Sequence, residues 1–184
     1  KGIEHVLNQG LKFILEKKVY KYIARLDCGD LCLENRFYLQ EKYLKNHLQC
    51  KLVGSNAIAI DTNGKELYKT ILPENSNTIK NKMYLNAMFL HPTVMFCSSI
   101  INEIGYYPTE YKAAEDYAFF FKIVQKYETH NIQKFLLKYE INTKGISLLK
   151  RNQQVSSRIQ IIKDNFYFGF WPFYGLLRNY ALRY

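Results

Sequence analysis

Two aspartates near the start of the chain have the chemistry and spacing to bind a cation. Asp27 and Asp30 follow the run VYKYIARLD, whose apolar and β-forming residues predict a buried strand that ends at Asp27. In open α/β sheets, ligands bind beyond the carboxyl ends of the strands. Two carboxylates at such a place can hold Mg²⁺ or Mn²⁺, and that ion can neutralise a diphosphate. The alternative is that Asp30 caps the helix that follows.

The composition is that of one globular domain with a preference for anionic partners. Of the 184 residues, 48% are hydrophobic and 23% are charged, which argues against disorder. Lysine and arginine exceed aspartate and glutamate by 26 to 16, and the net charge of +10 favours nucleotide diphosphates, nucleic acid or an acidic membrane surface. The basic residues form no clustered stripe and no nucleic-acid-binding motif, so we expect no nucleic-acid partner.

The cysteines predict a reducing compartment. They are Cys28, Cys32, Cys50 and Cys97, with no C-x-x-C pair and no histidine at zinc-ligand spacing near them. Free thiols are typical of the cytosol, and we therefore expect a cytoplasmic protein.

Helical and strand patterns alternate along the chain. Apolar residues with a helical period predict helices over residues 1–18, 35–46, 79–86, 98–104 and 115–127, with a polar helical stretch from residue 149. Runs rich in β-forming residues predict strands over residues 19–27, in a hairpin at residues 51–69 that turns at residues 61–64, after residue 91, and over residues 135–141. In the first helix one face carries Ile3, Val6, Leu7, Leu11 and Ile14 or Leu15. The alternation predicts an α/β fold, and the hairpin predicts a mixed sheet.

The order of several segments resembles family 2 glycosyltransferases. The segments are KGIEHVLNQGLKFI, YIARLDCGD followed by ENRFYLQEKYL, KLVGSNAIAIDTNGKE, HPTVMF, IGYYPTEYKAAEDYAFFFKI and KYEINTKGIS. The resemblance covers about residues 2–157. It implies the GT-A fold, which is the Rossmann-like mixed sheet of nucleotide-diphospho-sugar transferases.

The resemblance assigns the first aspartates to the donor side. Asp27 corresponds to the first aspartate of the family's R-x-D-x-D-D segment, near the sugar nucleotide, and Asp30 to its last acidic position. Both are candidate ligands of a divalent metal, Mg²⁺ or Mn²⁺. Gly29 stands where the family has the middle aspartate, which is expected to hold the metal. Either Asp30 takes over that role or metal binding is weakened.

Two basic residues are candidates for contact with the sugar nucleotide. Arg25 precedes Asp27 by two residues and therefore points to the same strand face, where it can pair with Asp27 or approach a phosphate. In KYEINTKGIS the family often has arginine and histidine where this chain has Glu140 and Asn142. Contacts from this segment to the leaving diphosphate are therefore in doubt, and Lys144 is the residue that could replace them.

The catalytic candidates lie at the start of a predicted helix. Glu115 and Asp116 match the family's ED motif, which implies that Asp116 is the general base for the acceptor hydroxyl, with Glu115 raising the pKa of the pair by like-charge repulsion. The alternative is that both acids only favour a helix N-terminus through the macrodipole. His91 and Thr93 match a segment on the acceptor side, although His91 can equally be a structural histidine.

The resemblance implies an inverting transfer of a sugar from a nucleotide-diphosphate sugar to a glycan or lipid-linked acceptor, in polysaccharide or lipopolysaccharide synthesis. The family's early P-x-Y-N-like strand and Asp-Asp-Gly-Ser-like turn do not occur here. We therefore expect residues 1–157 to form a partial domain without its first strands. A catalytically inactive remnant that only binds or packs is the alternative.

The end of the chain is aromatic and basic. Residues 166–184 contain nine aromatic residues, and the uncharged run of residues 166–177 is too short to cross a bilayer and is expected to be broken by Pro172. Aromatic side chains beside Arg178 and Arg183 suit a membrane interface. Residues 158–184 are therefore expected either to touch the inner face of the plasma membrane or to pack on the domain or a second subunit.

Overall fold

The chain folds around one curved mixed sheet. The computed structural model describes residues 2–141 and 150–183. Within these residues the strand order is β1-β5-β3-β6-β2, and β4 pairs with β3 outside this path. The strands are β1 (Tyr22–Ala24), β2 (Leu31–Cys32), β3 (Cys50–Ile60), β4 (Glu66–Thr70), β5 (Met95–Cys97) and β6 (Glu128–Glu140). The predicted mixed α/β sheet is confirmed.

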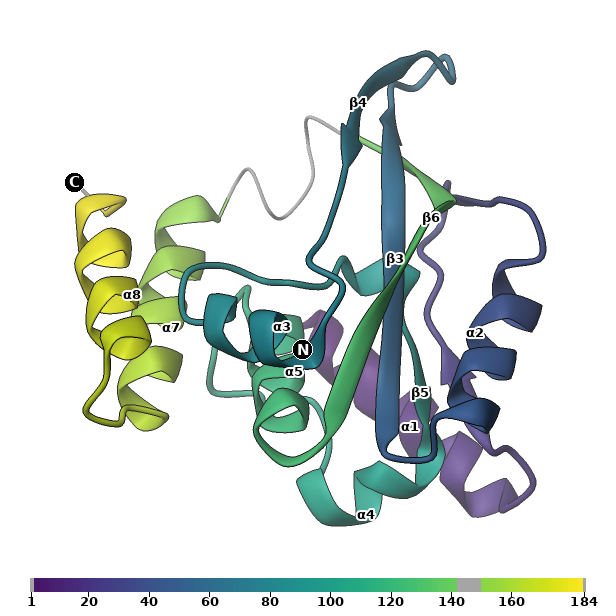
Figure 1. Cartoon of the computed structure of the whole chain (residues 1–184), viewed down its shortest axis with the longest axis horizontal. Helices are drawn as coiled ribbons and strands as arrows, with labels where there is room; N and C mark the ends of the chain where they lie inside the picture. Colours follow the sequence, from purple (N-terminus) through teal and green to yellow (C-terminus); the bar gives the residue numbers. More distant parts are fainter. Residues whose placement is uncertain (1, 142–149, 184) are drawn as a thin grey trace.

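Helices cover both sides of the sheet. They are α1 (Ile3–Lys17), α2 (Arg36–Asn46), α3 (Ser76–Lys82), α4 (Ile101–Ile104), α5 (Glu115–Lys126), α7 (Arg151–Asp164) and α8 (Phe170–Ala181), with 3-10 turns η1 (His91–Thr93) and η2 (Ser98–Ile100). Figure 1 shows α2 on one side of β3 and β6, with α3 and α5 on the other. Beyond these, α7 and then α8 form the outer layer on the same side.

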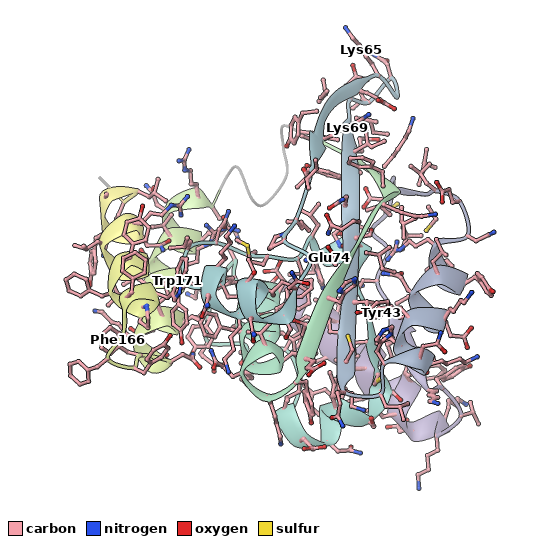
Figure 2. All side chains as sticks on the ribbon, viewed as in Figure 1. Tyr43, Lys65, Lys69, Glu74, Phe166 and Trp171 are labelled. Carbon is pink, nitrogen blue, oxygen red and sulfur yellow. The ribbon has the colours of Figure 1, made fainter. Side chains whose placement is uncertain are left out.

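The centre of the sheet is the parallel pair of β3 and β6. Their register runs from Cys50 opposite Glu128 to Ile60 opposite Glu140. All but one of the β3 residues are buried, which suits a strand covered on both faces and explains its nearly continuous apolar run. The β3–β4 hairpin extends beyond the helices, with Lys65 at its tip (Figure 2). Its turn has φ of +81° at Gly64, as the Asn-Gly sequence predicts.

The core lies between this sheet and α5. Phe119, Phe120, Phe121 and Ile123 are fully buried. Phe119 stacks on Tyr107 with ring centroids 4.2 Å apart. The aromatic run of α5 therefore forms the main apolar layer under the strands and also fixes a tyrosine that belongs to the candidate site.

The first helix is confirmed, but its apolar face is only partly used. Leu11 is buried, and Leu7, Ile14 and Leu15 pack against the core. Ile3 and Val6 were expected on the same face, yet they are 43% and 67% exposed. Their side chains therefore contribute little to the contact between α1 and the rest of the protein.

Three other boundaries differ from the predictions. A two-residue strand, β2, lies in the predicted loop and pairs with β6. α3 begins at Ser76, inside the predicted loop before residue 79. β6 begins at Glu128, well before the predicted start at Phe135, and its first half is polar because Asn131 donates hydrogen bonds to Pro73 O (2.8 Å) and Met88 O (2.9 Å). The first half of β6 binds these two neighbouring segments through polar contacts, so it lacks the apolar pattern expected of a strand.

The C-terminal helices form a layer of their own that docks on Tyr84. The Tyr84 hydroxyl donates to Asn165 O (2.9 Å), and α8 packs so closely that a Cβ on Gly175 would lie 2.4 Å from Tyr84 O. Pro172 does not break this segment; it lies in the first turn of α8, where a missing backbone N–H leaves no bond unmade. The expected boundary between residues 157 and 158 falls inside α7.

This close approach generates the first prediction. Gly175→Ala should lower the free energy of unfolding by about 2 kcal/mol, because the added methyl group meets backbone rather than a flexible side chain. Gly10→Ala is the matched control, because a Cβ there has nothing within 4 Å, and it should raise stability by about 1 kcal/mol through helix propensity. Urea unfolding measures both. Equal effects of the two substitutions would contradict the packing of α8 on Tyr84.

Candidate active site

The site begins with an ion pair just beyond the end of β1. Arg25 Nη2 lies 2.6 Å from Asp27 Oδ1, so the predicted pair is present. The predicted strand to Asp27 is wrong, because β1 ends at Ala24 and both residues follow it. The Arg25 backbone N–H donates to Val94 O (2.9 Å), which holds this residue against the segment after η1. Arg25 Nε is buried without an acceptor among residues 2–141 and 150–183. The guanidinium thus keeps a donor that is not used by the protein atoms described.

Asp30 is bound to the end of β6. Its Oδ1 accepts the backbone N–H of Glu140 (3.1 Å), so the alternative that Asp30 caps α2 is not what the structure shows. Burial raises the pKa of Asp30 to about 6, and the nearby charges of Asp27 and Glu140 raise it further against the effect of that hydrogen bond. Asp27, Asp30 and Glu140 therefore act on one another electrostatically.

Gly29 adopts a conformation that suits glycine. Its φ is +94°, a value that a side chain disfavours. A Cβ at this position would lie 3.6 Å from Glu140 Oε2. Gly29 and Glu140, two of the positions at which the chain departs from the pattern that it resembles, thus lie close to each other.

The carboxylates fit a metal ion only as a shared ligand set. The part of the chain that the structure describes contains no group of three or more histidine, cysteine, aspartate or glutamate side chains arranged to hold a metal. Mg²⁺ and similar ions are often bound by one or two protein carboxylates together with substrate phosphates and water. Asp27 and Asp30 fit that arrangement, and they do not form a closed protein cage.

A neutral histidine lies near the ion pair. His91 Nε2 is 3.0 Å from the hydroxyl of Tyr107. Burial, together with the charge of Arg25, lowers the pKa of His91 to about 4, so the ring is neutral near pH 7. Burial also raises the pKa of Tyr107, with Asp116 and Asp27 among the charges that contribute, so its hydroxyl stays protonated. Tyr107 thus lies within electrostatic reach of both aspartates.

Thr93 has a structural position. Its side chain is fully buried, and its hydroxyl donates to Leu90 O (2.8 Å) inside the η1 turn. The Thr93 carbonyl accepts a hydrogen bond from Gln40. Among the described contacts, both polar groups of Thr93 therefore serve the fold.

The acidic pair occupies the first turn of α5. Burial raises the pKa of both Glu115 and Asp116, and the charge of Asp116 also raises the pKa of Glu115. The sequence suggests like-charge repulsion as the cause of a raised pKa, but burial is the larger cause. Asp116 Oδ1 accepts the N–H of Tyr117 (2.7 Å), and the positive charges of Arg158 and Arg25 lower its pKa. Asp116 is therefore a desolvated carboxylate with cations nearby.

Arg158 is a residue of this site that the sequence analysis missed. It projects from α7 between the buried residues Val155 and Ile159. Its guanidinium carbon lies 5.7 Å from the centre of the Tyr117 ring, and its Nε is buried without an acceptor among the described residues. An arginine flanked by buried aliphatic positions of one helix was the available sign, because such a cation usually has a partner in the core.

A buried arginine and a buried glutamine of α2 connect the segments that carry the site. Arg36 is only 1% exposed; its Nη2 donates to Arg25 O (2.7 Å) and its Nε donates to Gln40 Oε1 (3.1 Å). Gln40 Nε2 in turn donates to Thr93 O (2.7 Å) and Val53 O (3.3 Å). α2 therefore connects β3 with the two segments that carry the ion pair and His91. These two residues belong to the segment ENRFYLQEKYL, yet nothing in its pattern marks them as buried.

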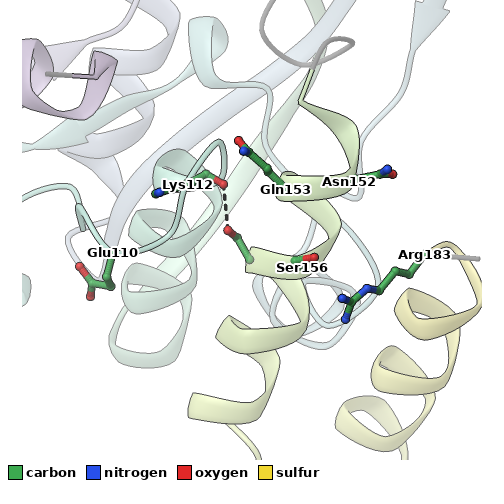
Figure 3. Close-up of a pocket in the computed structure, with 7 residues that line it drawn as sticks. Glu110, Lys112, Asn152, Gln153, Ser156 and Arg183 are labelled. Atoms are coloured by element: carbon green, nitrogen blue, oxygen red, sulfur yellow. Dashed lines mark hydrogen bonds between the residues drawn. The ribbon is translucent and has the colours of Figure 1, made fainter.

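A polar groove adjoins the acidic pair. It has a volume of about 460 Å³ and lies between the segment that leads into α5, one face of α7 and the end of α8 (Figure 3). Ser157 Oγ donates to Lys112 O (2.8 Å) across it. Hydroxyl, amide and charged groups line the groove: Glu110, Lys112, Asn152, Gln153, Ser156, Ser157 and Arg183. Such a lining suits a ligand with many hydroxyl groups.

One predicted residue cannot be placed. Lys144, the candidate contact to the diphosphate, lies outside the described residues, as does Asn142. The structure therefore brings together Arg25, Asp27, Asp30, His91 and Asp116, and the role of Lys144 stays a prediction.

The Arg36–Gln40 network generates a stability prediction. Gln40→Leu should lower the free energy of unfolding by about 3 kcal/mol, because it removes the buried hydrogen bonds to Arg36 Nε, Val53 O and Thr93 O. Gln9→Leu on the exposed side of α1 is the matched control and should change stability by less than about 0.5 kcal/mol. Urea unfolding again measures the difference, and a small effect at Gln40 would contradict the role of the network.

His91 generates a pH prediction. Its folded-state pKa of about 4 lies below the value of about 6.5 in the unfolded chain, so stability from this residue is lost as the pH falls from 6.5 toward 4. Between pH 7 and pH 5 the original protein should lose about 2 kcal/mol more stability than His91→Gln. The comparison between the two proteins is needed because Asp30, Glu115 and Asp116, with raised pKa values, act in the opposite direction. Identical pH profiles would contradict a buried neutral His91.

Comparison with known proteins finds similarity to glycosyltransferases. No family model matches the chain. It is 27% identical over 163 residues to the amylovoran biosynthesis glycosyltransferase AmsE of Erwinia amylovora, and the match covers 88% of this chain and 59% of that protein. It is 31% identical over 143 residues to the O-antigen biosynthesis glycosyltransferase WbnJ of Escherichia coli, covering 76% of this chain and 55% of the relative. An uncharacterized glycosyltransferase of Methanocaldococcus jannaschii is 33% identical over 137 residues, and the match covers 73% of this chain and 47% of that protein. The chain thus spans about half the length of these curated relatives.

A solved structure has the same fold. The mannosyltransferase PcManGT from Pyrobaculum calidifontis, solved in complex with GDP-Man and Mn²⁺, is 14% identical with a TM-score of 0.59. The match covers 100% of this chain and 49% of that one. The chain is therefore similar in sequence to glycosyltransferases and folds like part of one.

Proposed function

We propose that this chain is part of a family 2, GT-A glycosyltransferase that moves a sugar from a nucleotide-diphosphate sugar to a hydroxyl group of a glycan or lipid-linked acceptor. The observation that carries the proposal is the cluster of Asp27, His91 and Asp116 around Arg25, whose charge acts on both His91 and Asp116. The relatives named for amylovoran and O-antigen synthesis support a role in cell-surface polysaccharide or lipopolysaccharide synthesis.

The donor side is proposed to lie beyond β1. Asp27 and Asp30 would hold a divalent ion, Mg²⁺ or Mn²⁺, and the ion would supply charge neutralisation at the leaving diphosphate. The GDP-Man and Mn²⁺ named for the mannosyltransferase of the same fold support this class of donor and cofactor. Arg25 holds the Asp27 side chain by an ion pair, and its guanidinium is proposed to approach a phosphate oxygen. Lys144 is proposed as a second phosphate contact.

The acceptor side is proposed to centre on Asp116. Burial raises the pKa of this carboxyl, which makes it a better proton acceptor, while Arg158 and Arg25 favour its ionised form. As the acceptor oxygen bonds to the anomeric carbon, its proton passes to Asp116, and the bond from the anomeric carbon to the diphosphate oxygen breaks with its electron pair. One displacement with one base inverts the configuration of the sugar.

The surrounding residues have supporting roles. Glu115 flanks the base, and His91 with Tyr107 forms a neutral pair that can hydrogen-bond a sugar hydroxyl without adding charge. The polar groove along α7 begins close to α5 and is proposed to hold the glycan part of the acceptor (Figure 3). Its hydroxyl and amide lining matches the hydroxyl groups of a sugar chain.

A second candidate is a remnant that keeps the fold without catalysis. The observation that favours it is Glu140, whose carboxylate faces Gly29 where the family has arginine to meet the leaving diphosphate. A negative charge in that place would repel the donor unless a metal ion intervenes.

Ligand binding separates the two candidates. The melting temperature of this chain should rise with Mn²⁺ and one of a panel of UDP-, GDP- and dTDP-sugars, and Asp27→Ala should abolish the shift. Asp116→Asn should keep the shift and, where the chain transfers sugar, lower kcat by about 10²-fold or more. Glu16→Gln, an exposed carboxylate on α1, is the control and should change neither result. A folded protein that shows no shift with any donor would support the remnant instead.

A further inference from the structure

α8 has its apolar side turned outward. The residues that face the rest of the protein are Pro172, Gly175 and Asn179, which are buried. The opposite side carries large apolar residues, and they are exposed by 69% (Phe170), 62% (Phe173), 44% (Tyr174) and 55% (Leu177). A helix of a soluble domain normally has the reverse arrangement. Packing of the described residues therefore does not explain why this side is aromatic.

The loop before α8 extends the same surface. Phe168 is 100% exposed, Tyr167 is 47% exposed and Phe166 is 39% exposed. Figure 2 shows Phe166 at the outer end of the α7–α8 pair, whereas Trp171 lies on the inner side and packs against the core. We call this surface the aromatic face; it consists of Phe166, Tyr167, Phe168, Phe170, Phe173, Tyr174, Leu177 and Tyr180. A contiguous apolar surface of this kind marks an interaction site.

The charges around the aromatic face point to an anionic partner. Residues 165–183 contain Arg178 and Arg183 and neither aspartate nor glutamate. Lys163 Nζ lies 5.7 Å from the centre of the Tyr180 ring, at the edge of the face. A second copy of this chain would bring the same cations and a net charge of +10 against this surface. A membrane rich in anionic lipids carries the complementary charge, and Tyr, Trp and Phe beside Arg and Lys are favoured at the boundary between headgroups and acyl chains.

The dimensions of the helix indicate how it meets the bilayer. No helix in residues 2–141 and 150–183 combines the length and apolarity needed to cross a membrane. α8 has 12 residues and one apolar side, which is the pattern of a helix that lies in the plane of the interface. Arg178 Nη1 donates to Leu85 O (2.6 Å), so the helix is held on the domain while its aromatic face stays free.

We propose that the aromatic face docks this protein on an anionic lipid surface, with α8 lying in the interface and Lys163 and Arg183 at the headgroups. This docking does not require the proposed transferase activity. Arg183 belongs both to the end of α8 and to the polar groove, so docking would bring the groove to the headgroup layer. If the proposed function also holds, on which this last step rests, the acceptor is a lipid-linked glycan whose sugars reach the groove from the membrane.

Vesicle binding tests the proposal. The chain should sediment with phosphatidylcholine vesicles that contain phosphatidylglycerol, bind pure phosphatidylcholine more weakly, and lose affinity as salt is raised. Combined Phe168→Ser, Phe170→Ser and Phe173→Ser should lower the affinity on the order of tenfold or more.

A matched triple variant controls for lost apolar surface. Val6, Phe13 and Val19 are exposed by 67%, 59% and 75% near the other end of the chain, and their replacement by serine should leave vesicle binding unchanged. If the aromatic-face triple variant does not fold, Lys163→Glu with Arg183→Glu tests the charge requirement and should weaken binding to anionic vesicles. Absent vesicle binding by the original chain, or equal binding by all variants, would overturn the proposal. Self-association without lipid that the aromatic-face substitutions abolish, together with absent vesicle binding, would assign the face to a second copy.

Discussion

The buried guanidinium of Arg36 is the constraint on which the site depends. A cation that is 1% exposed is unfavourable unless polar groups surround it, and burial accordingly lowers its pKa. Its donors bind Gln40 Oε1, Arg25 O and Cys32 Sγ (3.5 Å), none of which is a carboxylate, while the charge of Asp30 acts from further away. The chain after β1 must therefore turn its carbonyl groups toward α2. The same turn leaves Asp27 facing outward, beside the side chain of Arg25.

One helix thus determines the relative position of both halves of the site. Gln40 accepts from Arg36 and donates to Val53 O and Thr93 O, so the central strand and the η1 turn are held by a single amide. Thr93 is two residues from His91, and Arg25 is two residues from Asp27. Because buried hydrogen bonds that lose a partner are costly, the two segments cannot move apart without breaking this network. The proposed donor and acceptor sides are thus held in a fixed relative position, which is the preorganisation that transfer between two substrates needs.

Local patterns predicted the parts of the fold that local forces determine. α2, α5 and the β3–β4 hairpin follow from apolar period and the Asn-Gly turn. The Arg25–Asp27 pair was predicted from alternation along a strand, but β1 ends at Ala24, so the pair forms in the segment after the strand. Contacts between residues far apart in the sequence could not be predicted from local patterns. Asp30 binds the backbone of a residue 110 positions later, and α7 brings Arg158 near Asp116. Pro172 was predicted to break the apolar run, but it lies in the first turn of α8. The effect of a proline depends on its position in a helix, and the apolar residues around it do not reveal that position.

The departures at Gly29 and Glu140 are better understood as one change than as two. Gly29 removes a carboxylate at the position that the family uses for metal, and its φ of +94° turns the chain in a way that favours glycine. The Glu140 carboxylate lies 3.6 Å from the point at which a side chain on residue 29 would begin. A negative group is therefore present at nearly the same place, supplied by β6 rather than by the loop. If the proposed donor site holds a divalent ion, Glu140 therefore supplies negative charge close to the position where Gly29 lacks it.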